Sequence, residues 1–117
     1  MEKRSFFESF KIALIGLRFV MQTQRNMRIH IIIGVLVILL GLLFKLSSLE
    51  MAILTLTIML VIVSEVINTA IELSLDFING KGHHPSVKLI KDIAAGGVLL
   101  ASINAVIVGS IIFLRHL

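Results

Sequence analysis

Four polar side chains fall on one face of an apolar stretch in the middle of the chain, and three of them are carboxylates. They are Glu65, Asn68, Glu72 and Asp76, within the sequence VIVSEVINTAIELSLDF. At about 100° per residue they share about 80° of the circumference of a helix, so adjacent members can contact one ligand. Glu65 follows the uncharged run 51–64. A carboxylate at that depth needs a partner, a proton or a chemical role.

Three kinds of chemistry suit such a stripe. Paired carboxylates supply the hard oxygen ligands that Mg²⁺ favours. A deep, partly desolvated Glu65 can act as a general base. A row of acidic groups can also carry protons or ions, but transport sites usually lie near the middle of a bilayer. This stripe lies toward one end of its apolar segment, which favours chemistry at the membrane interface. Asp76, considered alone, is also consistent with a solvated residue among the lipid headgroups that has no chemical role.

Groups that could bind a phosphate follow the stripe. Lys91 and Asp92 are expected to open the next helix, where backbone N–H groups attract anions. The preceding segment NGKGHH is rich in glycine and can approach a phosphate closely, although it does not match the P-loop motif. His83 and His84 lie in this segment. Adjacent loop histidines are more often exposed than metal-bound, and a nucleotide contact is the stronger alternative for His84.

Long apolar segments must position these groups. Three of them, at about 27–44, 51–78 and 93–114, are typical of transmembrane helices. The 117 residues are 57% hydrophobic, which is more apolar surface than a small soluble domain can bury. We therefore expect one all-α membrane domain over residues 1–117. The chain has no cysteine, so disulfides and thiolate metal sites are excluded. No nucleic-acid partner is expected.

An amphipathic helix is predicted ahead of these spans, at about 5–22. Its apolar side chains recur at helical spacing; they are Phe6, Phe10, Ala13, Leu14, Leu17 and Met21. We expect this helix to lie in the membrane interface. Packing against the rest of the protein is the alternative, and both can hold. Glu8 and Lys11 interrupt the apolar run, and we expect the N-terminal segment to be retained rather than cleaved as a signal peptide.

The basic residues predict the orientation. Nine Lys and Arg residues lie in the first 30 residues or in the loop after the second span, and only Lys45 and Arg115 lie on the opposite side. The nine are Lys3, Arg4, Lys11, Arg18, Arg25, Arg28, Lys81, Lys88 and Lys91. An excess of positive charge marks the cytoplasmic side of a membrane protein. The N-terminus and the acidic end of the second span should therefore face the cytoplasm, where ATP is found.

The motif SEVINTAIELSLD, with KDIAAGGVLL 14 residues later, resembles the small bacterial integral-membrane lipid kinases, the diacylglycerol kinase and undecaprenol kinase family. The resemblance covers about residues 7–113. RNMRIH and HHP are more similar to the undecaprenol kinase branch of Gram-positive bacteria. The resemblance implies a homotrimer in the bacterial plasma membrane with active sites shared between subunits. It also implies phosphorylation of a lipid alcohol that depends on ATP and Mg²⁺, with undecaprenol favoured and diacylglycerol as the second candidate.

The same resemblance implies roles for the polar residues. Glu65 matches the catalytic base, Asn68 the polar residue beside it, and Glu72 a carboxylate that holds the metal. Positions that contact the nucleotide correspond to His84, Lys91 and Asp92 in this sequence. Asp76 matches a position that is often acidic, and the resemblance gives it no role.

One position departs from the family pattern. Gln24 stands where the family has a second metal-binding Glu. A neutral amide offers an oxygen but lacks the charge that attracts Mg²⁺, so we expect weaker metal binding, an altered site or an engineered substitution. Two non-enzymatic alternatives stay open, a small ion or proton transporter and an inactive accessory subunit. A row of small residues in the last span suits helix packing between subunits or contact with lipid; it contains Gly97, Ala101, Ala105 and Gly109.

Overall fold

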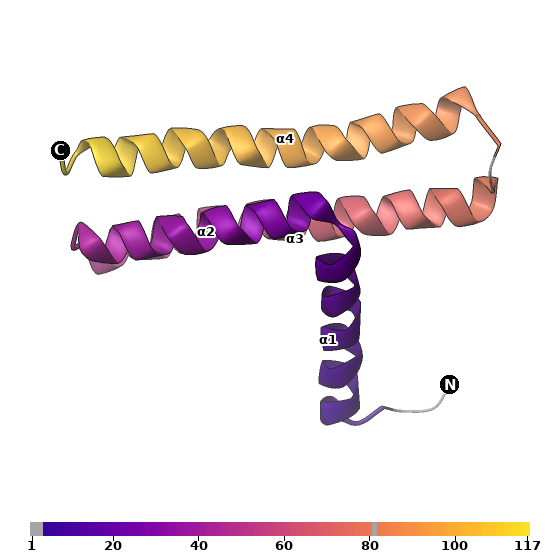
Figure 1. The fold of residues 1–117 in the computed structure, drawn as a ribbon, viewed down its shortest axis with the longest axis horizontal. Helices are drawn as coiled ribbons and strands as arrows, with labels where there is room; N and C mark the ends of the chain where they lie inside the picture. The colour runs from indigo at the N-terminus through magenta and orange to yellow at the C-terminus, as the bar shows by residue number, and fades with distance from the viewer. Residues whose placement is uncertain (1–3, 81) are drawn as a thin grey trace.

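The computed structural model describes residues 4–80 and 82–117, and every regular element in this part of the chain is an α-helix (Figure 1). The helices are α1 (Phe6–Thr23), α2 (Arg25–Leu43), α3 (Ser48–Asn79) and α4 (Pro85–Leu114). The last three are each long and apolar enough to cross a membrane. The prediction of an all-α membrane protein with an amphipathic helix before three apolar ones is confirmed, while the homotrimer stays a prediction. Lys3 and Lys81, counted above among the basic residues, lie outside the described residues.

Two helices begin with the same local arrangement of hydrogen bonds. Ser5 and Glu8 form a capping box at the start of α1, and Ser47 and Glu50 form another at the start of α3. In each box the serine hydroxyl accepts from the backbone N–H of the glutamate, at 3.2 Å in α1 and 3.1 Å in α3. The glutamate side chain accepts from the serine N–H in return. These bonds satisfy N–H groups that have no partner within the helix.

The start of α4 differs from the sequence-based expectation. The helix begins at Pro85, whose fixed backbone angle suits the first helical position. The ring Nδ1 of His84 caps it by accepting from the N–H of Ser86 at 3.1 Å. Lys91 and Asp92 therefore lie in the second turn, and the prediction that they open the helix is wrong. Hydropathy located the start of the apolar stretch, whereas proline and capping locate the start of the helix.

Helix α1 runs across the direction of the other three helices and meets them where α2 begins (Figure 1). Gln24 has extended backbone angles and separates α1 from α2. The guanidinium of Arg28 donates to the carbonyls of Met21 and Gln22, at 3.0 and 3.1 Å. These carbonyls lie at the end of α1, which has no basic residue in its own last turn. Arg28 therefore stabilises the elbow between the two helices, and the arrangement suits a helix lying along a membrane surface.

Helix α3 is in contact with each of the other helices. Its start is joined to the end of the chain by His116, whose Nε2 lies 2.9 Å from the Glu50 carboxylate. Phe44 and Phe113 also pack edge to face at this end, with ring centres 5.5 Å apart. Little apolar surface is hidden within one chain, since only 6% of the most apolar window of α4 is buried. Lipid or further subunits must therefore cover the spans.

The packing of α2 on α3 depends on two glycines. A Cβ atom at Gly34 would lie 2.8 Å from Cγ2 of Ile58, and one at Gly41 would lie 2.9 Å from Sδ of Met51. Both distances are shorter than carbon and sulfur side-chain atoms tolerate. The methionine at Gly41 is flexible and can move, but the Ile58 methyl is on a β-branched carbon with restricted rotation. Gly34 therefore fixes how closely α2 approaches α3.

We expect Gly34→Ala to lower the free energy of unfolding by about 1–3 kcal/mol through overpacking, partly offset by the higher helix propensity of alanine. The matched variant is Gly16→Ala in α1, where a Cβ atom would have no neighbour within 4 Å. There only the propensity gain of up to about 1 kcal/mol remains. Thermal unfolding in detergent micelles, followed by circular dichroism, should give midpoint shifts of opposite sign. Equal shifts in the two variants would contradict the role of Gly34.

Candidate functional site

The polar stripe predicted on α3 is partly buried. Glu65, Asn68 and Thr69 have exposed fractions of 3%, 7% and 1%. Val20 of α1 and Met27 of α2, on either side of the elbow, are buried as well. The hydroxyl of Thr69 donates to the Glu65 carbonyl at 2.9 Å, which satisfies it within the helix. The Glu65 carboxylate therefore lies in a largely desolvated position, as the uncharged run 51–64 before it predicted.

Asn68 and Glu72 form the next level of the stripe. The Asn68 side-chain N–H group donates to the Glu72 carboxylate at 3.4 Å, and Glu72 is half-buried. The other end of the same amide, Oδ1, is buried and has no hydrogen-bond partner. An unsatisfied buried polar atom costs about 1–3 kcal/mol, so it calls for an explanation. A ligand held beside Glu72 would supply the missing partner.

An ionisable side chain from another helix approaches the Glu65 carboxylate. Nε2 of His30 in α2 lies 3.8 Å from Oε2 of Glu65. The side chain of His30 is 22% exposed, while that of Glu65 is 4% exposed. His30 was not among the candidate residues identified from the sequence. The two residues are far apart in the chain, and only the packing of α2 on α3 brings them together.

The polar groups near the ends of α3 and α4 are paired with one another. Asp76 of α3 forms an ion pair with Lys91 of α4, which identifies a partner for the one acidic residue whose role the sequence left open. Asp92 pairs with Lys88 one turn earlier, at 2.7 Å. These pairs are largely exposed, and exposed ion pairs contribute at most about 1 kcal/mol. They can therefore rearrange easily around a bound anion.

These groups occupy two levels along α3. The helix has 32 residues, about 48 Å at 1.5 Å per residue, which exceeds a hydrocarbon core of about 30 Å. The joined ends of α3 and α4 reach past α1 (Figure 1). The buried Glu65 and the exposed Asp76 are separated by about 16 Å of helix rise. The stripe thus extends from the apolar part of the bundle into the surrounding water.

Gln24 lies close to the level of Glu72. The antiparallel packing of α2 and α3 places Gly34 beside Ile58 and His30 beside Glu65. Continuing this register by one to two turns brings Gln24 to the segment between Asn68 and Glu72. Gln24 is half-buried, and its amide nitrogen lies 3.4 Å from the Thr23 hydroxyl. The register therefore brings Gln24 to about the level of Glu72 along α3.

These oxygen atoms fit a magnesium ion bound together with a nucleotide. Within residues 4–80 and 82–117, no group of three or more His, Cys, Asp and Glu side chains gathers in metal-binding geometry. Mg²⁺ is usually bound through one or two carboxylates together with substrate phosphates rather than in a cage of protein ligands. The Glu72 carboxylate and the unpartnered Asn68 oxygen meet that lower requirement.

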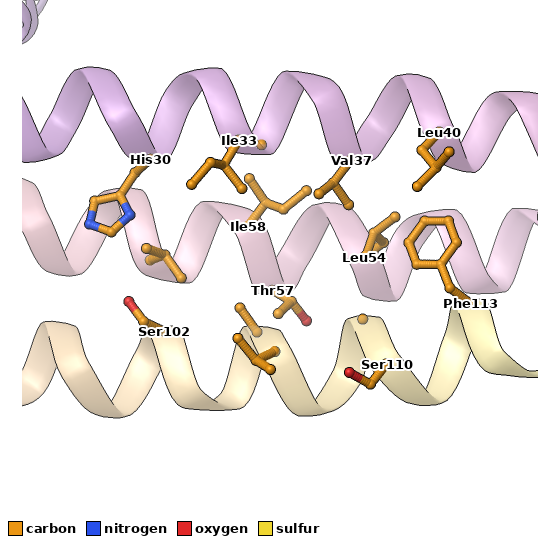
Figure 2. A pocket seen from close by; sticks show the side chains of 15 residues that line it. His30, Ile33, Val37, Leu40, Leu54, Thr57, Ile58, Ser102, Ser110 and Phe113 are labelled. Carbon is orange, nitrogen blue, oxygen red and sulfur yellow. The ribbon is translucent and has the colours of Figure 1, made fainter.

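A groove of about 540 Å³ runs along α2, α3 and α4 (Figure 2). His30 and Ser102 lie at one end, and Leu40 and Phe113 lie at the other (Figure 2). Its wall is mainly apolar and includes Ala105 and Gly109 from the row of small residues in α4. A long apolar chain could therefore lie in the groove with a polar end group beside His30, whose Nε2 is 3.8 Å from the Glu65 carboxylate.

Comparisons with known proteins agree with these features. Residues 11–113 match the family described as prokaryotic diacylglycerol kinase. The chain is 45% identical over 109 residues to a protein from Synechocystis sp. named diacylglycerol kinase, covering 93% of this chain and 62% of the relative. It is 39% identical over 116 residues to the undecaprenol kinase of Bacillus subtilis, covering 99% of this chain and 94% of the relative.

Proposed function

Because the chain belongs to the prokaryotic diacylglycerol kinase family, as its motifs predicted, we propose that it transfers the terminal phosphate of ATP to a membrane lipid alcohol. The observation that carries the proposal is the position of Glu65. Its carboxylate is buried 3.8 Å from His30, which lines the end of an apolar groove, and carboxylates of the same helix continue toward water. One end of this arrangement suits a lipid and the other suits a nucleotide.

Glu65 is the general base of the proposed reaction. The acyl or prenyl chain of the substrate lies in the groove, with its hydroxyl beside the carboxylate. Glu65 takes the hydroxyl proton as the oxygen forms a bond to the γ-phosphorus, and the bond from that phosphorus to the ADP oxygen breaks. General-base assistance of this kind contributes about 10²–10⁴-fold. Phosphoryl transfer otherwise needs mainly positioning and neutralisation of charge.

The nucleotide is held at the exposed level. Glu72 would hold Mg²⁺ with Asn68 beside it, and the metal would supply neutralisation of charge on the phosphates. Lys91 exchanges its partner Asp76 for phosphate oxygen atoms, and Asp92 contacts the nucleotide near it. Because Nδ1 of His84 accepts from the helix backbone, Nε2 carries the proton and can donate to the nucleotide. Asn68 also holds the Glu72 carboxylate in place through its amide N–H.

Undecaprenol is the favoured substrate, and diacylglycerol is the second candidate. This preference is supported by the segments RNMRIH and HHP, which resemble the undecaprenol kinase branch of the family. The excess of basic residues on one side supports a site at the cytoplasmic face of a bacterial plasma membrane. A homotrimer with shared active sites would close the sides of the groove that a single chain leaves open.

The test is a purified-protein assay in lipid vesicles with ATP and Mg²⁺, comparing undecaprenol with diacylglycerol. We expect labelled phosphate to appear on the lipid, with undecaprenol giving the higher kcat/KM. A higher kcat/KM for diacylglycerol would reverse the substrate assignment alone. Absence of transfer to either alcohol would favour an accessory subunit, and ion flux through sealed vesicles without nucleotide would favour a transporter.

A further inference from the structure

We propose that His30 carries the proton of each catalytic cycle from Glu65 to water. The inference rests on the proposed function, in which Glu65 takes a proton from the lipid hydroxyl. It explains how that proton then reaches water. Within the part of the chain that the structure describes, His30 supplies the one ion-pair partner of the Glu65 carboxylate. Neither the sequence motifs nor the names of the relatives assign a role to this residue.

The need for a relay follows from burial. A general base that has taken a proton must lose it before the next substrate reacts. The Glu65 side chain is only 4% exposed, so direct exchange with bulk water is hindered. Glu72 lies two turns away along the helix, about 10 Å by helix rise. The proton therefore needs a nearer acceptor.

The position and chemistry of His30 meet this need. Its Nε2 lies 3.8 Å from the Glu65 oxygen, slightly too far for a direct hydrogen bond but close enough for one water molecule to contact both atoms at about 2.8 Å. The ring lines the end of the groove and is 22% exposed, more than Glu65. Histidine is also the side chain that gains and loses protons most readily near neutral pH.

The proposed step is balanced. After phosphoryl transfer, the neutral Glu65 carboxyl gives its proton to His30 through the bridging water and becomes a carboxylate again. The resulting imidazolium releases the same proton to bulk water and returns to its neutral form. No electrons move and no other reactant is needed. The protein is then ready for a second lipid, with Glu65 and His30 in their starting states.

This role predicts a kinetic pattern that loss of structure would not produce. In His30→Ala, the first turnover starts from an ionised Glu65 and should proceed at nearly the wild-type rate. Later turnovers wait for the trapped proton, so the steady-state rate should fall by about 10²-fold, the lower end of the range for acid–base catalysis. Rapid-quench measurement of phosphorylated lipid should therefore show a burst of one product per site. Imidazole added to the solution should raise the rate of the slow phase, because it can accept the proton in place of the missing side chain.

Three comparisons make the test decisive. His30→Gln removes the proton carrier with little change in size, and it replaces His30→Ala if that variant does not fold. His116→Gln is the matched control, because His116 forms the other histidine–glutamate pair, at the opposite end of α3; it should leave the ratio of first-turnover to steady-state rate at the wild-type value. An unchanged ratio in both His30 variants would overturn the relay. Failure of the wild-type protein to phosphorylate lipid would instead overturn the proposed function.

Discussion

Glu65→Gln is expected to slow phosphorylation of the lipid by about 10²–10⁴-fold without unfolding the protein. Glutamine has nearly the same shape as glutamate but cannot take a proton from a hydroxyl. Glutamine also keeps a hydrogen-bond acceptor at this buried position, so the helix bundle should keep its fold. The expected loss lies in kcat, because the groove and the nucleotide groups are unchanged. Transfer of labelled phosphate from ATP to undecaprenol in vesicles measures it directly.

Two controls separate chemistry from structure in this experiment. Circular dichroism and size-exclusion chromatography in detergent should give the same result for Glu65→Gln and for the wild type. Glu65→Asp retains a carboxylate that is shorter by one carbon and should keep part of the activity. Wild-type activity in Glu65→Gln would remove this residue as the base and leave the stripe as a binding or transport feature.

The sequence predicted the parts of the site that depend on a single helix. Glu65, Asn68 and Glu72 are placed on one face by helical periodicity alone, and the apolar run before Glu65 correctly indicated a buried carboxylate. The three apolar helices were found for the same reason, since hydropathy and length suffice to identify them. Local pattern was enough wherever the partners lie within a few turns of each other.

Features that depend on packing between helices escaped the sequence analysis. The contact between His30 and Glu65 follows from the register of α2 on α3, which the close approach at Gly34 helps to set. The pairing of Asp76 with Lys91 depends in the same way on the register of α3 and α4. Lys91 and Asp92 do not open α4, because Pro85 and His84 determine its start rather than hydropathy. The sequence shows each of these residues, but it does not show which residue of another helix each one contacts.

The second large effect concerns the metal. Glu72→Gln should raise the Mg²⁺ concentration needed for half-maximal activity by at least about tenfold, since a tenfold change corresponds to about 1.4 kcal/mol and charges a few ångströms apart interact more strongly than that near a protein surface. Gln24→Glu should lower the same concentration, because it adds a carboxylate where the α2–α3 register brings Gln24 close to Glu72. Titration of activity with Mg²⁺ measures both changes.

The opposite signs of these two effects distinguish a metal site from general damage. Most substitutions impair an enzyme, so tighter metal binding in Gln24→Glu would indicate that the added carboxylate lies close to the metal. The double variant with Gln24→Glu and Glu72→Gln moves the carboxylate from α3 to α2 at constant charge, and it should recover part of the lost affinity if both residues face one ion. Binding of Mn²⁺ with a non-hydrolysable ATP analogue, followed by electron paramagnetic resonance, reports this without relying on activity. An unchanged affinity in Gln24→Glu would mean that Gln24 faces away from the metal, and Glu72 would then act with the phosphates alone.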